Sequence, residues 1–173
     1  EGARLVFDAL NSSYEVETFL ITESANEKYF DASVQMQRKS KNSYFVSDTL
    51  SQKISETKNS QGVFAVCKMK NENISLKTGQ KYIALDNLQD PGNLGTVIRT
   101  AEALGISSVI VGGGCDVFNP KVLRASMGSV LRLDVFECQS LAPVLQKAKS
   151  LGIKTYATSP DSSAKKINET QFP

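Results

Sequence analysis

Residues 82–158 alternate short apolar segments with amphipathic ones, and this alternation constrains the fold more than any other feature of the chain. Four segments have the length and apolar composition of buried strands, at 82–88, 107–111, 132–137 and 153–158. The three segments between them carry apolar residues at helical spacing, at 94–104, 120–127 and 141–151. Strands that alternate with helices predict a parallel sheet with right-handed crossovers. We therefore expect an open, Rossmann-like α/β sheet in this half of the chain.

The first 70 residues predict a smaller and less regular α/β unit. Their apolar alternation indicates strands at 16–22, 44–46 and 61–67, with helical patterns at 4–10, 26–37 and 49–54. The polar stretch at 71–80 is typical of a linker. We therefore expect two domains, at 1–70 and 81–173, joined by residues 71–80.

The chain contains no histidine, and this absence excludes several kinds of active site. It excludes hydrolases that rely on a histidine base and metal centres that rely on histidine ligands. Cys67, Cys115 and Cys138 lack the paired spacing of a structural zinc site, so we expect no bound metal. We expect these thiols to be reduced, as in a cytoplasmic protein.

Net charge and hydropathy constrain the partners less strongly. No apolar run approaches the roughly 20 residues that a membrane span needs, so we expect no membrane association. The formal net charge is only +2. A nucleic-acid partner would therefore have to bind a local basic patch and not the whole surface.

The segment at 86–99 joins the first strand of the second half to its first helix. Ligands bind at such strand-to-helix junctions in parallel α/β sheets. On a helix at 94–104, Arg99 lies opposite the apolar stripe, and two interpretations are open. Arg99 is either a solvated side chain paired with Glu102, or it lies over the bare surface of Gly95 and points toward Asn93 at the ligand edge.

The glycines at 112–114 do not form a nucleotide fingerprint. A GxGxxG pattern would require glycine where the chain has Val117, and no Walker A pattern is present. A tight turn is the favoured interpretation. The missing fingerprint argues against a nucleotide-dependent oxidoreductase.

Two groups of basic residues are candidates for nucleic-acid contacts. Lys121 and Arg124 lie on the polar side of the helix predicted at 120–127, near the same sheet edge. Arg38, Lys39 and Lys41 form a small basic patch in a predicted loop. For both groups, phosphate contact competes with simple solvation.

Residues 82–136 resemble the SpoU (TrmH-like) family of RNA ribose 2′-O-methyltransferases, in the SPOUT superfamily. The resemblance is carried by NLGTVIRTA at 93–101, similar to the family's NxGxxxR motif, and by RASMGS at 124–129 followed by Arg132-Leu133. The EGARLV segment at 1–6 and QGV at 61–63 resemble the family's L30e-like RNA substrate-binding domain.

The resemblance implies transfer of a methyl group from S-adenosylmethionine to a ribose 2′-OH of structured RNA. It implies that Asn93 and Arg99 are the active-site pair and that the complete protein is a homodimer. It favours ribosomal RNA over transfer RNA as the substrate, because the L30e-like domain resembles that of rRNA-modifying members.

The sequence departs from the family in one large respect. The family's GNEGxG and SLNxSxA segments are missing, so we expect a SPOUT domain truncated before its C-terminal trefoil knot. Of the implied cofactor site, only Thr158 and Ser159 remain. We therefore expect this fragment alone to be inactive and to bind S-adenosylmethionine poorly. The alternative is a non-catalytic RNA-binding protein on a degenerate SPOUT scaffold.

Overall fold

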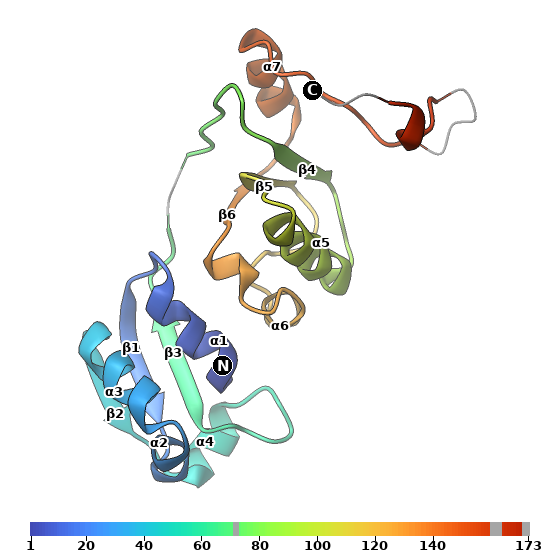
Figure 1. Ribbon diagram of the computed structural model, residues 1–173. Helices are drawn as coiled ribbons and strands as arrows, with labels where there is room; N and C mark the ends of the chain where they lie inside the picture. The colour runs from blue at the N-terminus through green and yellow to red at the C-terminus, as the bar shows by residue number, and fades with distance from the viewer. Residues whose placement is uncertain (71–72, 160–163, 171–173) are drawn as a thin grey trace.

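The computed structural model describes residues 1–70, 73–159 and 164–170, which form two separate three-stranded sheets (Figure 1). In the first sheet, β1 (Val16–Ile21) lies between β2 (Asn42–Phe45), which is parallel to it, and β3 (Val63–Cys67), which is antiparallel. The core of this unit contains the fully buried side chains of Phe19 and Met36. The three predicted strands are therefore present, within a few residues of the expected ends.

Two of the four helices of the first unit begin at a capping side chain. The unit contains α1 (Ala3–Asp8) with the 3-10 turn η1 (Ala9–Asn11), α2 (Glu23–Lys28), α3 (Phe30–Lys39) and α4 (Asp48–Ile54). Thr22 caps α2 and Ser47 caps α4, each by accepting a hydrogen bond from a backbone amide. The single helix predicted at 26–37 is therefore two helices, which meet at the non-helical backbone of Tyr29.

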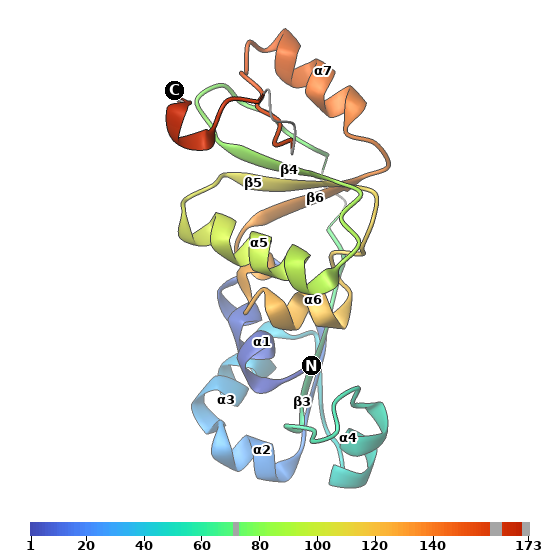
Figure 2. The ribbon, with the colours of Figure 1, turned by 90° about the vertical axis from the view of Figure 1, so that its right-hand side faces the viewer.

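The second sheet consists of three parallel strands in the order β4 (Tyr82–Asp86), β5 (Ser108–Gly112) and β6 (Asp134–Cys138). On one face lie α5 (Pro91–Ala103), α6 (Pro120–Ala125) and the 3-10 turn η2 (Ser129–Leu131). On the other face lies α7 (Ala142–Ser150), as Figure 2 shows. The parallel α/β arrangement and three of the four predicted strands are confirmed.

The fourth predicted strand, at 153–158, is wrong for this structure. Residues 153–159 belong to no strand, and only Ile153 packs against the core beside α7. Beyond it, Tyr156 is half exposed. A strand forms only where a neighbouring strand can hydrogen-bond to its backbone. Alternation of apolar and polar residues in the sequence does not show that such a neighbour is present. A further 3-10 turn, η3, covers Ile167–Glu169.

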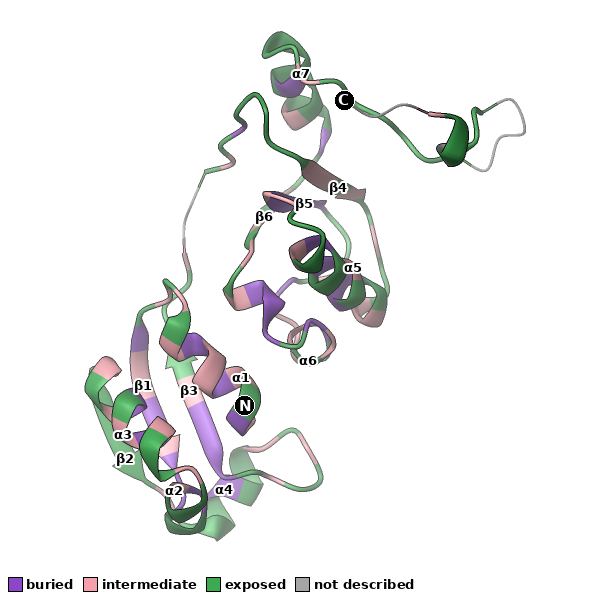
Figure 3. Ribbon diagram, viewed as in Figure 1, coloured by how far each residue is buried: buried purple, intermediate pink, exposed green. Residues whose placement is uncertain are grey.

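The predicted linker contributes to the second unit. Leu76 is buried with Ile110 and Phe136 on the face of the sheet that α7 covers. Figure 3 shows this burial pattern along both units. None of the helices within the described ranges is long and apolar enough to cross a membrane.

Candidate active site

The carboxyl ends of the three parallel strands meet at one edge of the sheet. In register, Asp86 lies beside Gly112, and Gly112 lies beside Cys138. Backbone hydrogen bonds join the loops that follow, including Cys115 N–H to the Leu88 carbonyl at 2.9 Å. The loops that follow β4 and β5 therefore converge at this edge of the sheet. Ser159, in contrast, follows no strand.

The triple glycine allows these loops to approach each other closely. Gly114 has a left-handed backbone (φ 81°), and a Cβ there would lie 2.5 Å from the carbonyl oxygen of Leu88. Any larger residue would therefore push the loops after β4 and β5 apart. The tight-turn interpretation is confirmed, and the packing against Leu88 explains why the turn needs glycine.

Helix α5 begins three residues before the predicted start, because Asp90 caps it. The Asp90 carboxylate accepts a hydrogen bond from the Asn93 amide at 2.7 Å, and Pro91 occupies the first helical position. Asn93 consequently lies in the first turn of the helix and not in a loop. The Asp-Pro pair is a helix-start signal that the sequence analysis missed.

Asn93 and Arg99 are both exposed on the polar side of α5, with Thr96 between them. The spacing of three residues places them along one ridge of the helix, about 9 Å from first to last. Within the part of the chain that the structure describes, neither side chain has a hydrogen-bond or ion-pair partner. An amide and a guanidinium are thus presented together next to the sheet edge.

Arg99 is unpaired because another arginine binds Glu102. The guanidinium of Arg132 donates to both carboxylate oxygens of Glu102, at 2.5 and 3.0 Å. This contact lowers the pKa of Glu102 and raises that of Arg132. The interpretation of Arg99 as a partner of Glu102 is therefore wrong.

Arg132 also links the two units of the molecule. Its Nη1 lies 3.1 Å from the carboxylate of Asp8, at the end of α1. One side chain thus connects the first unit to the helix that carries Asn93 and Arg99. The sequence analysis missed this bridge, which spans residues far apart in the chain.

Gly95 has a different role from the predicted one. It is buried, and a Cβ there would lie 2.5 Å from Ala125 Cβ and 2.7 Å from the carbonyl oxygen of Val122. Gly95 therefore permits close packing of α5 against α6 and does not leave a bare surface under Arg99.

The packing of α5 on α6 brings one predicted basic residue close to Asn93. The Cε atom of Lys121 lies 3.9 Å from the position that a Cβ on Gly92 would occupy. Arg124 lies one turn further along α6, and both side chains are exposed. These two residues therefore extend the polar surface of α5.

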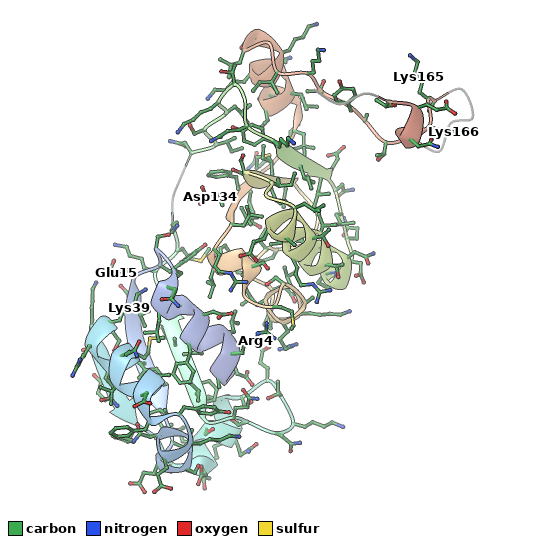
Figure 4. The ribbon with its side chains drawn as sticks, viewed as in Figure 1. Arg4, Glu15, Lys39, Asp134, Lys165 and Lys166 are labelled. Atoms are coloured by element: carbon green, nitrogen blue, oxygen red, sulfur yellow. The ribbon has the colours of Figure 1, made fainter. Side chains whose placement is uncertain are left out.

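The predicted basic patch at 38–41 is largely neutralised. Lys39 Nζ donates to the carbonyl oxygens of Ala9, Leu10 and Ser12 at 2.6 to 2.8 Å, so all three of its donors are used. Lys41 is paired with Glu15 at 2.5 Å, which raises its pKa. Figure 4 labels Lys39 and Glu15 in this region. Only Arg38 is exposed and unpaired among the described residues of the patch.

The predicted cofactor residues are not gathered into a site. Thr158 and Ser159 are exposed and lie in the segment that joins no strand. Two clefts, of about 250 and 280 Å³, open between the two units, and none of the residues that line them is Asn93, Arg99, Thr158 or Ser159. The described residues therefore do not fit an S-adenosylmethionine pocket by themselves. No group of three or more potential metal ligands occurs within the described ranges.

Comparison with known protein families identifies the chain. The model of the SpoU rRNA methylase family matches residues 80–173, and the model of the MRM3-like substrate-binding domain matches residues 1–65. The chain belongs to the SpoU rRNA methylase family. This assignment agrees with the motif carried by α5.

Several characterised relatives of this SpoU family chain are rRNA methyltransferases. The 23S rRNA (guanosine(2553)-2′-O)-methyltransferase RlmP of Bacillus subtilis is 35% identical over 160 residues, which is 91% of this chain and 60% of the relative. The mitochondrial rRNA methyltransferase 3 of Xenopus tropicalis is 34% identical over 78% of this chain and 34% of its own length. The chain thus spans about 60% of the bacterial relative.

Solved structures of RNA methyltransferases have a similar fold. An AdoMet-bound rRNA methyltransferase from Sinorhizobium meliloti has a TM-score of 0.73 and 28% sequence identity to this chain. The match covers 87% of this chain and 57% of the methyltransferase chain. A structure described as an RNA 2′-O ribose methyltransferase has a TM-score of 0.73 at 30% identity over 95% of this chain and 63% of its own.

Proposed function

We propose that the whole protein transfers a methyl group from S-adenosylmethionine to a ribose 2′-OH of ribosomal RNA. The observation that carries the proposal is the pair of exposed side chains on α5, Asn93 and Arg99, which have no partner among the described residues, in a chain of the SpoU family. The cofactor supplies the electrophilic methyl group. The protein positions the hydroxyl and adjusts the electrostatics around it.

Arg99 acts as a fixed positive charge and not as a base. A guanidinium keeps its positive charge and has no acceptor for a proton. Placed beside the reacting ribose, it binds the hydroxyl or the neighbouring phosphate and stabilises the negative charge that develops on the attacking oxygen. Asn93 orients the same ribose by hydrogen bonding.

Residues 1–70 serve as an L30e-like RNA substrate-binding domain, and residues 81–173 as the first part of the methyltransferase domain. Among the residues predicted to contact RNA, Lys39 and Lys41 are bound by protein partners. Arg38, Lys121 and Arg124 have no side-chain partner among the described residues, so their donors are available to RNA. In the whole protein, the cofactor pocket includes a knotted segment, and the protein acts as a cytoplasmic homodimer. Thr158 and Ser159 join the pocket when that segment is present.

The test is to map 2′-O-methylation across ribosomal and transfer RNA in a strain that lacks the gene. We expect one ribosomal site to lose its methyl group and to regain it when the gene is restored. An unchanged methylation map, together with retained RNA binding by the purified protein, would instead establish the non-catalytic RNA-binding alternative.

A further inference from the structure

A polar-rimmed cleft of about 280 Å³ opens between the first unit and the underside of α6. Its walls come from the start of α1, from the loop at 57–61 and from the end of α6. We propose that this cleft binds one unpaired nucleotide of the RNA substrate, an inference that rests on the proposed RNA methyltransferase function. The volume is just below the usual range of about 300–1,000 Å³ for ligand pockets, which suits a single base and not a stacked pair.

Two arginines, one from each unit, form the cationic rim. Arg4 on α1 and Arg124 on α6 both line the cleft, and both are exposed. Figure 4 labels Arg4 on the side of α1 that lies toward α6. Its Nη1 approaches the sulfur of Met127 at 4.0 Å, and within the described residues neither guanidinium has a carboxylate partner. Two unpaired guanidinium groups at one opening favour a phosphate.

The floor of the cleft is apolar and suits the face of a base. Leu5 and Leu123 are half-buried there, and Met127 is 37% exposed beside them. The amide side chains of Asn59 and Gln61 also line the cleft. Gln61 Oε1 accepts a hydrogen bond from the Ala3 amide at 2.7 Å, which leaves its Nε2 to donate to a base edge. Apolar and arginine contacts to a base face, combined with phosphate binding, are typical of unpaired nucleic-acid strands.

Glu1, the acidic residue that lines the cleft, is already hydrogen-bonded within the protein. The carboxylate of Glu1 accepts hydrogen bonds from Ser55 Oγ at 2.6 Å, Thr57 Oγ1 at 2.7 Å and the Glu56 amide at 3.0 Å. Glu1 therefore holds the loop that forms one wall, and it is not available to pair with either arginine.

The backbone at the base of the cleft is strained. Met127 has φ 54°, a left-handed conformation that a long side chain without a local polar group rarely adopts. Such strain costs about 1–3 kcal/mol and concentrates at ligand-binding positions. Gly128 follows with φ 86°, and a side chain there would overlap the carboxylate of Asp8, so the two units are packed closely at this point.

The position of the cleft relative to α5 gives the bound strand a direction. Lys121 lies one turn before Arg124 on α6 and next to Gly92 at the start of α5. A strand held by Arg4 and Arg124 therefore continues past Lys121 toward Asn93. The cleft would thus set the distance between a recognised unpaired base and the ribose that is methylated.

The test measures binding of a fluorescent oligouridylate to the chain by anisotropy at several salt concentrations. The Arg4→Ala/Arg124→Ala double variant should bind about 10-fold or more weakly, with a shallower salt dependence because two phosphate contacts are lost. Lys149→Ala on α7, an exposed charge far from the cleft, is the matched control and should bind within about 2-fold of the wild type. Equal affinity of the double variant and the control would overturn the proposal.

A second variant tests the floor separately from the charges. Met127→Asn should keep the left-handed backbone, because asparagine tolerates that conformation, while it removes the apolar contact. The wild type should prefer oligouridylate over an abasic strand of equal charge, and Met127→Asn should lose this preference. A wild type without preference would overturn the nucleotide site. RNA that binds in the cleft but is never methylated by the whole protein would instead contradict only the proposed activity.

Discussion

At the scale of single residues, the site depends on which charged side chains are already engaged. Arg99 is unpaired because Arg132 holds Glu102. Lys39, in contrast, looked like part of a basic patch and is bound to three carbonyl groups. Sequence position alone does not distinguish an engaged cation from a free one, since the partners lie 27 to 30 residues away in the chain.

Neighbouring residues Arg38 and Lys39 give a direct test of this distinction. Lys39→Ala should lower the free energy of unfolding by about 1–3 kcal/mol, because the carbonyl groups of η1 and Ser12 lose a charged donor. Arg38→Ala should leave stability within about 0.5 kcal/mol, as expected for an exposed side chain without partners. Urea unfolding of both variants measures the difference, and equal stabilities would contradict the assigned role of Lys39.

Gly95 offers a second test at the residue scale. Gly95→Ala places a Cβ against the backbone of α6, at Val122 and Ser126, which cannot yield as a flexible side chain would. We expect a loss of about 1–3 kcal/mol in unfolding free energy from overpacking. Thr100→Ala on the exposed side of α5 is the control. A Gly95→Ala variant as stable as Thr100→Ala would show that α6 moves away at little cost.

At the scale of elements, most of the second unit could be predicted from its periodicity. The strands β4, β5 and β6 and the helices α5, α6 and α7 all lie within a few residues of their predicted ranges. The errors have local physical causes. The start of α5 was set too late because the Asp90-Pro91 cap was overlooked, and the strand at 153–158 requires a neighbour that its own sequence does not specify.

The bridge between α1, α5 and Arg132 is an element-scale contact that no local pattern predicts. Two double-mutant cycles, Asp8→Asn with Arg132→Gln and Glu102→Gln with Arg132→Gln, should each give a coupling of about 0.2–1 kcal/mol, because the side chains are 29 to 36% exposed. Additive effects within error in both cycles would contradict the bridge.

The pH dependence of this bridge has a defined sign. Arg132 lowers the pKa of Glu102 in the folded protein below its ordinary value of 4.5. The stability that Glu102 contributes is therefore present above pH 4.5 and is lost as the pH falls through its folded pKa. The difference in unfolding free energy between wild type and Glu102→Gln should shrink below pH 4.5, whereas Glu27→Gln, on exposed α2, should show no such change.

At the scale of the whole molecule, the chain contains a substrate-binding unit and the strand-to-helix junction of a SpoU family domain. The predicted family, and an α/β fold with a parallel sheet, are confirmed. The candidate site was predicted only in part. Asn93, Arg99, Lys121 and Arg124 are exposed as expected, but the sequence could not place Thr158 and Ser159, whose position depends on strand pairing that the described residues do not make.

The incomplete cofactor site makes a prediction for residues 1–173. We expect no binding of S-adenosylmethionine at useful affinity, because Thr158 and Ser159 are exposed and lie in no strand. Isothermal titration calorimetry measures this directly. Micromolar binding would contradict the prediction and would mean that the described residues hold the cofactor without the knotted segment.

The central claim is that Arg99 takes part in methyl transfer and not in general RNA binding. The most direct measurement compares wild type and Arg99→Ala of the whole protein, by methyl transfer to ribosomal RNA and by RNA affinity on the same preparations. We predict that Arg99→Ala abolishes methyl transfer while the RNA dissociation constant stays within about 3-fold of wild type, since the proposed RNA contacts of Arg38, Lys121 and Arg124 are unchanged. Full methyl transfer by Arg99→Ala would contradict the account.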